Sequence, residues 1–338
     1  MSRLGRVACF GEVLIDMMAE PPATSDSPRA FLQFAGGAPA NVAVAVAKLG
    51  GDSNFIGMLG QDMFGDFLLK SLQDAKVSTD GVVRTDQART ALAFVALDAH
   101  GERTFSFYRP PAADLLFRAP HFDQVDFQNI RVFHVCSNSM TEDEIATTTF
   151  EGMRRASAAG AVVSFDMNLR PMLWPPKVDP APRVWQALKL ADVIKLSKEE
   201  FEWLCAGHGS DPEAIHKKIL QGRASLLLVT DGDHPLRWYT RLDAGQIPAL
   251  QVQVQDTTAA GDAFVGGFLY QLTQRLEGDA TLEAFCGDRS AIEACLQFAA
   301  AVGALAVTKK GAFAAMPTLT EVTNLIEEQQ GCRATTTA

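Results

Sequence analysis

The sequence predicts an α/β protein with three layers, α/β/α, in which a mainly parallel central sheet lies between two layers of helices and carries a small β-sheet lid. Three observations support this fold class: short apolar runs, longer helical patterns that alternate with them, and two segments that break the alternation. A length of 338 residues suits one large domain. We therefore expect a single domain over residues 1–330 and a disordered, polar tail at 331–338.

Short, mainly apolar runs predict strands that are buried on both faces, as in a parallel sheet. These runs occupy residues 7–10, 132–136, 162–165, 192–196 and 226–229. Helical patterns alternate with them and occupy residues 39–49, 142–159 and 212–220. Strands that alternate with helices in this way predict a parallel sheet with helices on both sides.

Residues 12–34 and 90–110 break this alternation because they contain alternating or β-branched runs. Within the second segment, residues 92–97 and 104–108 flank a five-residue turn, 98–102, that contains Gly101, which is typical of a hairpin. We interpret both segments as a small lid that projects from the domain. An antiparallel extension of the main sheet remains the alternative.

The composition argues against several classes of protein. The chain is 47% hydrophobic and 21% charged with a net charge of −10, which disfavours nucleic-acid binding, because that function needs a concentrated basic face. No apolar run reaches the length of a signal or membrane segment, so no membrane association is expected. The six cysteines form no CxxC pair, which indicates reduced thiols and a cytoplasmic location.

The strongest functional pattern is the segment 256–264, in which small residues lead into a helical pattern. The first N–H groups of a helix lack partners and attract anions, and the small residues 259–261 would let a phosphate approach the backbone. Asp262 lies at the mouth of this predicted anion hole, where it would take a proton from an attacking hydroxyl. The alternative is a helix-capping role for Asp262, worth about 1 kcal/mol of stability.

Weaker patterns lie at other predicted ligand-facing positions. Gly36 and Gly37 precede a helix that starts with proline, so Asn41 would face a ligand that approaches the glycines closely. Asp16 and Arg170 each follow a predicted strand, where ligands of parallel sheets bind. A tight turn at the glycines, a solvated Asp16 and a surface ion pair of Arg170 are the corresponding alternatives.

Several common motifs are absent from the sequence. No Gly-Lys pair occurs, which excludes a Walker-type P-loop, and the single Gly-x-Gly, at 207–209, lacks the third glycine of a dinucleotide fingerprint. The six histidines are dispersed, and His134 lies inside an apolar strand, which favours a core role over metal binding.

Taken together, these segments resemble the ribokinase-like (PfkB) family of sugar kinases from about residue 7 to about residue 328. The segments that carry the resemblance are 36–41, 57–65 and 256–264. Within that family the chain is most similar to fructokinases, through segments 9–16, 107–110, 166–170, 194–197 and 308–312. The resemblance implies a ribokinase-like fold that binds ATP and Mg²⁺ and phosphorylates a terminal sugar hydroxyl.

Fructose, giving fructose 6-phosphate, is the first substrate that the resemblance implies. The second is 2-keto-3-deoxygluconate, whose carboxylate Tyr108 and Arg109 would grip. A function of another class, a non-catalytic sugar or nucleotide sensor on the same fold, is disfavoured by the intact Asp262. A homodimer through the lid is also expected, because an exposed β face seeks a partner.

The resemblance also assigns roles to single residues. Asp262 would be the base, and Arg170 would stabilise the transferring charge. The anion hole would consist of the backbone amides of Ala259, Ala260, Gly261 and Asp262. The sugar would be held by Asp16, Gly36, Gly37, Asn41 and Arg109. The nucleotide would be held by Lys195, Ser197, Glu200, Thr230, Gly232, Gly261 and Gly311.

Two ions enter through the same resemblance. Glu200 would act on Mg²⁺ indirectly, and the loop with Asp256 and Thr258 would bind a monovalent cation, K⁺ in most relatives. The chain departs from the family at Ala259, where many members have glycine, and at Ser197, which replaces asparagine. Residues 231–235, beside the predicted nucleotide loop, are also unusual and would affect nucleotide preference.

Overall fold

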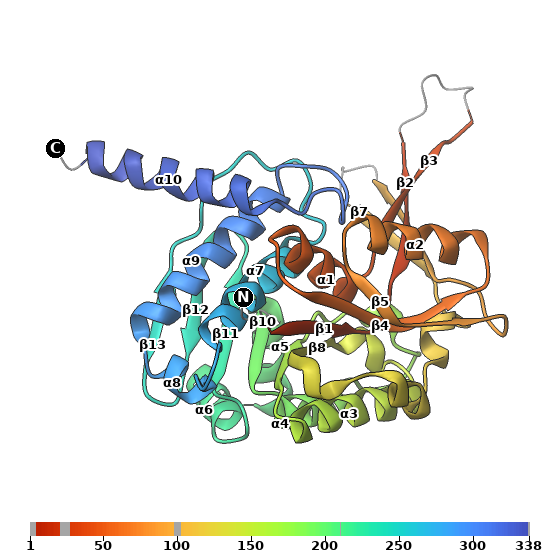
Figure 1. Ribbon diagram of the computed structural model, residues 1–338, viewed down its shortest axis with the longest axis horizontal. Helices are drawn as coiled ribbons and strands as arrows, with labels where there is room; N and C mark the ends of the chain where they lie inside the picture. Colours follow the sequence, from red (N-terminus) through yellow and green to blue (C-terminus); the bar gives the residue numbers. More distant parts are fainter. Residues whose placement is uncertain (1–4, 21–27, 98–102, 210, 337–338) are drawn as a thin grey trace.

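The computed structural model describes residues 5–20, 28–97, 103–209 and 211–336, and they form two sheets (Figure 1). The large sheet has nine strands in the order β13-β12-β11-β10-β9-β8-β1-β4-β5. Its strands are β1 Arg6–Phe10, β4 Ser53–Gly60, β5 Ser78–Thr85, β8 Ile130–Cys136, β9 Val162–Asp166, β10 Val193–Ser197, β11 Leu226–Asp231, β12 His234–Tyr239 and β13 Ala244–Ile247. Neighbouring strands from β5 to β11 are parallel, and β12 and β13 add an antiparallel edge.

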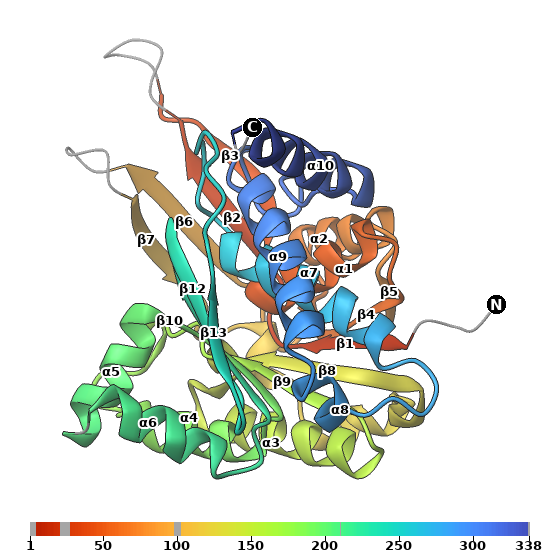
Figure 2. The ribbon, with the colours of Figure 1, turned by 90° about the vertical axis from the view of Figure 1, so that its left-hand side faces the viewer.

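Helices cover both faces of the large sheet, so the predicted α/β/α class is confirmed (Figure 2). One layer consists of α1 Ala38–Lys48, α2 Met63–Asp74, α7 Ala260–Arg275, α8 Leu282–Cys286, α9 Arg289–Ala306 and α10 Leu319–Thr336. The other consists of α3 Asp143–Ala158, α4 Ala181–Leu190, α5 Lys198–His208 and α6 Pro212–Leu220. Short 3₁₀ turns are η1 Ala113–Leu116, η2 Ala119–Gln124, η3 Phe127–Asn129, η4 Ser137–Met140 and η5 Pro171–Leu173.

Alternate residues of the central strands pack into two separate cores. In β1, Val7 and Cys9 join the core beneath α1, α7 and α9, whereas Ala8 and Phe10 join the core beneath α3 and α4. Each fully buried large apolar side chain contributes about 1.5–3 kcal/mol. Burial on both faces is why these strands are almost continuously apolar in the sequence. His134 is the core residue predicted, fully buried, with its Nδ1 3.0 Å from the Ser164 hydroxyl.

The smaller sheet is separate from the large one, so the alternative of an extended main sheet is wrong. It has four strands in the order β3-β2-β6-β7, namely β2 Leu14–Ala19, β3 Phe31–Gly36, β6 Leu92–Leu97 and β7 Arg103–Tyr108. The predicted hairpin is the antiparallel pair β6–β7, whose turn at 98–102 lies outside the described residues. The sheet projects from the body of the molecule (Figure 2).

The segment 57–65 joins the main sheet to this projecting sheet. Asp62 caps α2 by accepting the Gly65 N–H at 2.8 Å. The same carboxylate accepts the Thr90 N–H at 2.9 Å and the Thr90 hydroxyl at 2.8 Å, just before β6 begins. One side chain therefore fixes both the start of α2 and the entry to the lid strands.

The tail differs from the prediction. Helix α10 runs to Thr336, through most of the stretch 331–338 that was expected to be disordered. Among the described residues, no helix is both long enough and apolar enough to cross a membrane.

Candidate active site

Two cavities meet at the N-terminus of α7. The first, here called the lid cavity, measures about 340 Å³ and is lined by Glu12, Leu14, Asp16, Gly37, Ala38, Asn41, Phe107, Asn138, Asn168, Arg170, Leu173, Thr257, Thr258, Ala259 and Asp262. The second, here called the apolar cavity, measures about 560 Å³, and its wall includes Ala260 and Gly261. Consecutive residues of one helix tip thus face different cavities, and Thr257 lies in both walls.

The backbone at this tip is open to a ligand. Ala259 adopts a left-handed conformation with φ of 59°, which turns the loop sharply into α7. The first i→i−4 hydrogen bond of the helix runs from the Ala263 N–H to the Ala259 carbonyl at 2.8 Å. The amides of Gly261 and Asp262 precede that bond and keep the donor character of a helix start. The Ala260 N–H differs from the prediction, because it donates to the Thr257 carbonyl at 3.3 Å.

Asp262 does not cap the helix. Its Oδ2 accepts the Asn41 amide at 2.7 Å, and its Oδ1 accepts the Asn168 amide at 3.3 Å. The residue is 7% exposed, and burial raises the pKa of its carboxyl to about 7, with the negative charge of Asp166 acting in the same direction. The Asn41 hydrogen bond and the cations Lys195 and Arg170 act in the opposite direction. A buried carboxylate of this kind is suited to exchange a proton near neutral pH.

Asp16 from β2 faces the same cavity as Asp262. Burial raises the pKa of its carboxyl to about 7, and the charges of Asp262 and Asp256 add to that effect. The glycine pair lies against these groups rather than against open space. A Cβ on Gly36 would lie 2.1 Å from Asp16 Oδ2, and one on Gly37, whose φ is 108°, would lie 2.7 Å from the Glu12 carbonyl oxygen. Gly37 lines the lid cavity, whereas Gly36 makes room for the Asp16 carboxylate.

The ends of β9 and β10 bring charged groups behind the α7 tip. Lys195 pairs with Asp166 across the two strands, with its Nζ 3.1 and 3.2 Å from the two carboxylate oxygens. Lys195 lines neither cavity, but a Cβ added to Gly261 would lie 3.2 Å from its ammonium. Arg170 lies in the wall of the lid cavity rather than in a surface ion pair.

Ser197 and Glu200, both predicted to lie at the nucleotide, form a capping box at the start of α5. The Ser197 hydroxyl accepts the Glu200 N–H at 3.2 Å, and Glu200 Oε2 accepts the Ser197 N–H at 2.8 Å. Glu200 Oε1 accepts the Leu169 N–H at 2.7 Å. Glu200 therefore holds the loop that carries Asn168 and Arg170, and its indirect action on Mg²⁺ stays a prediction.

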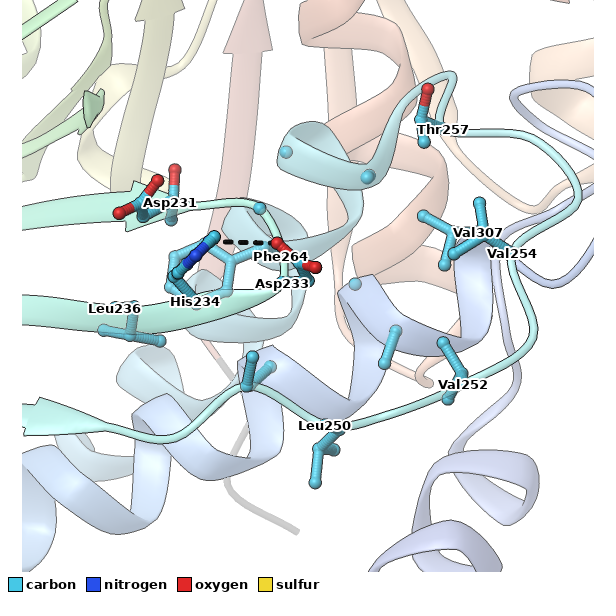
Figure 3. Close-up of a pocket in the computed structure, with 18 of the residues that line it drawn as sticks. Asp231, Asp233, His234, Leu236, Leu250, Val252, Val254, Thr257, Phe264 and Val307 are labelled. Atoms are coloured by element: carbon cyan, nitrogen blue, oxygen red, sulfur yellow. Dashed lines mark ion pairs between the residues drawn. The ribbon is translucent and has the colours of Figure 1, made fainter. Parts of the chain in front are cut away.

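The apolar cavity lies between β11, β12, the coil before α7, and α9 (Figure 3). Thr230 and Gly232, which were predicted to line the nucleotide phosphates, are among the residues that line it. Its remaining wall consists of Asp231, Asp233, His234, Leu236, Ala249, Leu250, Gln251, Val252, Val254, Thr257, Ala260, Gly261, Phe264, Ala300, Gly303, Ala304 and Val307. His234 Nδ1 lies 3.0 Å from Asp233 Oδ1 at this wall. Small residues of α9 leave room for a flat, apolar group.

Gly311, which was predicted to lie beside the adenine, is not among the residues that line the apolar cavity. Its N–H donates to Asp256 Oδ2 at 3.1 Å, while the Thr258 N–H donates to Asp256 Oδ1 at 2.7 Å. Asp256 is 2% exposed. These bonds draw the 256–258 loop and residue 311 together beside the lid cavity.

Arg109, which was predicted to contact the sugar, is not among the residues that line the lid cavity. It follows β7, is 1% exposed, and donates to Asp114 Oδ2 through Nε at 2.8 Å and Nη2 at 2.6 Å. Its charge also faces Glu12, whose burial raises its carboxyl pKa while Arg109 lowers it. Arg109 therefore stabilises the carboxylates beneath the cavity.

The sequence reasoning missed several wall residues. Glu12 and Asn138 form one side of the lid cavity, joined by an amide hydrogen bond of 3.0 Å, and Phe107 covers another side from β7. Glu12 lay inside a segment already singled out, so its carboxylate was a usable signal. Nothing in the sequence distinguishes the α9 residues of the apolar cavity from ordinary helix-packing positions.

Among the described residues, no group of three or more histidine, cysteine, aspartate or glutamate side chains could hold a metal ion by itself. A polar cavity with a buried base, an apolar cavity, and an anion-binding helix tip between them define a phosphotransferase that acts on a polyhydroxylated acceptor.

The chain belongs to the pfkB family of carbohydrate kinases, which it matches over residues 5–319. Fructokinase-1 of Zea mays is 41% identical over 324 residues, covering 95% of this chain and 98% of the relative. The crystal structure of a Xylella fastidiosa fructokinase with bound ATP is 61% identical, with a TM-score of 0.92 over 96% of this chain and 99% of that one. A double mutant of the Vibrio cholerae O395 fructokinase, in a form bound to fructose, ADP and potassium, is 31% identical, with a TM-score of 0.82 and the same coverage.

Proposed function

We propose that this protein is an ATP-dependent fructokinase that converts fructose to fructose 6-phosphate. One observation carries the proposal: the tip of α7 is a wall shared by two cavities, with Ala260 and Gly261 on one side and Asp262 on the other. An acceptor hydroxyl beside Asp262 and a phosphoryl group beside Gly261 would then be neighbours. The fructokinases among the relatives, one of them solved with ATP, support this assignment of substrates.

The lid cavity suits a sugar because it offers hydrogen-bond acceptors. Asn41 Oδ1 and Asn138 Oδ1 are buried without a partner among the described residues, and buried acceptors of this kind favour hydroxyl donors. Asp16 adds a carboxylate to the same wall. Asp262, held by Asn41 and Asn168, would accept the proton of the reacting hydroxyl as the phosphoryl group is transferred.

The phosphoryl group would bind at the helix tip. The amides of Gly261 and Asp262 would donate to its oxygens, and the Arg170 guanidinium would face the charge that develops during transfer. Mg²⁺ bound with the nucleotide would neutralise the phosphates. Glu200 would support this end of the site through the backbone of Leu169.

A monovalent cation, K⁺ in the first instance, is a further part of the proposal. The buried Asp256 carboxylate and its tight turn with Thr258 lie next to the lid cavity, and hard oxygen ligands suit such an ion. The potassium in the Vibrio cholerae structure supports the choice of ion. The bound cation would neutralise the Asp256 carboxylate and stabilise the loop 256–258 that leads into α7.

The assay that tests the function follows ADP formation from ATP and Mg²⁺, with and without K⁺, over a panel of sugars. We expect fructose to give the highest kcat/KM. A clear preference for 2-keto-3-deoxygluconate would displace fructose, but the geometry disfavours it, because Asp114 already neutralises Arg109. Tight sugar binding without ADP formation would favour the sensor instead.

Two coarser features complete the proposal. We expect a homodimer through the lid, because Phe31 and Tyr108 are 41% and 66% exposed and both pack edge-to-face against Phe94. Light scattering on the wild-type protein and on Tyr108→Ser would test it, with dissociation expected only in the variant.

The cytoplasmic location rests on the free state of Cys9, Cys136, Cys205, Cys286 and Cys295.

A further inference from the structure

The ion pair between Asp166 and Lys195 lies where a purely structural pair is costly. The two residues are direct neighbours in the register of β9 and β10, and they are 2% and 8% exposed. Taking two charges out of water costs free energy that their attraction often fails to recover, so well-packed apolar residues serve stability as well or better. The pair therefore calls for a role other than holding the two strands together.

The position of the ammonium relative to the α7 tip suggests that role. Gly261 lines the apolar cavity, and an added Cβ on Gly261 would lie 3.2 Å from Lys195 Nζ. The ammonium therefore lies directly behind the part of the cavity wall that Gly261 forms. An ammonium has three donors, and its only acceptors among the described residues are the two oxygens of Asp166. Donor capacity remains for an anion on the other side of Gly261.

We propose that the Asp166–Lys195 pair belongs to the catalytic machinery: Lys195 contacts the phosphoryl group in transfer past Gly261, and Asp166 positions Lys195 for that contact. The inference rests on the proposed kinase function and deepens it. A preorganised cation in a site that excludes water stabilises developing negative charge far better than one in solution. Gly261 is then needed for access as well as for its backbone amide.

The charges around Asp262 give this proposal a second, independent measurement. The titratable or charged groups that face Asp262 are Asp16 from β2, Cys136 from β8, Asp166 and Arg170 from β9 and its following loop, and Lys195 from β10. Lys195 lowers the pKa of Asp262, whereas Asp166 raises it. The two members of the pair therefore act on the pKa of the base in opposite directions, and a pH profile reports whether both charges lie beside Asp262.

The experiment compares Lys195→Met, Lys195→Arg and Asp166→Asn with the wild-type enzyme, in the fructose and ATP assay. In Lys195→Met we expect kcat to fall about 10²–10³-fold, the loss typical of one preorganised donor. Fructose binding, measured calorimetrically without nucleotide, should stay within about threefold, because Lys195 is outside the lid cavity. Lys217→Met, which removes a lysine that is 60% exposed on α6, is the matched control and should behave as wild type.

The pH dependence of kcat/KM tests whether the two charges of the pair act on the pKa of Asp262. Its acid limb should move upward by roughly one pH unit in Lys195→Met, stay in place in Lys195→Arg, and move downward in Asp166→Asn. Wild-type kcat in Lys195→Met, or an unmoved acid limb in both Lys195→Met and Asp166→Asn, would overturn the proposal. If one variant fails to fold by circular dichroism, the other two still decide it. A wild-type protein that forms no ADP would instead remove the proposed function.

Discussion

The two cavities that meet at α7 differ in how they can recognise a ligand. The lid cavity is lined by carboxylates and amides, including Glu12, Asp16, Asn41 and Asp262. The apolar cavity is lined mainly by small and aliphatic side chains such as Ala300, Val252 and Leu250, with polar groups at the end near the helix tip. The lid cavity can therefore recognise a ligand through hydrogen bonds, whereas the apolar cavity recognises a ligand mostly through its shape.

This difference indicates where selectivity resides. A site built from buried hydrogen-bonding groups rejects a ligand that leaves them unpaired by about 10⁴–10⁵-fold, whereas an apolar pocket discriminates by only about 10–200-fold. The protein should therefore be strict about its sugar and more tolerant about its nucleotide base. Four measurements test this comparison, and they are given in order of decreasing effect.

The largest effect is expected at the point where the cavities meet. Asp262→Asn keeps the shape of the side chain but removes the base, so kcat should fall by about 10²–10⁴-fold. Fructose affinity should change little, because an amide still fits beside Asn41 and Asn168. Steady-state kinetics and calorimetry provide the two numbers, with the exposed Asp279→Asn as control. Near-normal turnover in Asp262→Asn would end the assignment of this residue as the base.

The pH profile of the wild-type enzyme should show the same group. Burial raises the pKa of Asp262 to about 7, and only the ionised form accepts a proton, so kcat/KM should fall about tenfold per pH unit below pH 7. Asp16, whose carboxyl pKa is also raised to about 7, would make the limb steeper if its charge is needed too. A profile that stays flat down to pH 5 contradicts both statements.

Removing the Asp16 carboxylate tests the lid cavity alone. Hydrogen bonds to a charged group contribute about 1.5–3 kcal/mol, so Asp16→Ala should raise the fructose KM roughly tenfold to a hundredfold. The ATP KM should stay within a factor of about three, because Asp16 lies in the lid cavity only. Equal losses for both substrates would show that the cavities are not independent.

The smallest effect is expected in the tolerant cavity. Ala304→Leu adds bulk to the α9 wall and should raise the ATP KM about tenfold, without changing the fructose KM, because overpacking a filled site costs about 1–3 kcal/mol. Ala294→Leu places the same bulk on the exposed face of α9 and is the control. An unchanged ATP KM in Ala304→Leu would place the nucleotide elsewhere.

The sequence predicted most of the fold because the central strands have a pattern that few other structures share. Strands buried on both faces are nearly all apolar, as at 226–229, whereas β12 and β13 lie at the edge of the sheet and carry polar residues such as Arg237 and Gln246, so they were missed. Helix α10 extends into the stretch 331–338, where a disordered tail was predicted, because a polar composition does not exclude a helix.

The site was predicted unevenly, for a physical reason. Asp16, Asn41 and Asp262 could be predicted because ligands of parallel sheets bind at the edge where strands end and the following helices begin. No sequence pattern reveals that Arg109 forms a buried ion pair with Asp114, five residues later. The α9 wall has no sequence signal at all, since alanine and glycine pack helices far more often than they bind ligands.

The left-handed turn at Ala259 has a consequence for regioselectivity. Gly261 and Asp262 are adjacent in the first turn of α7, so helix geometry fixes the separation between the Gly261 amide and the Asp262 carboxylate, and the turn at Ala259 sets the direction in which both point. A sugar is therefore phosphorylated only if its own shape places the reactive hydroxyl oxygen between these two fixed groups. An epimer or a shortened homologue could occupy the lid cavity and still remain unphosphorylated, as a competitive inhibitor.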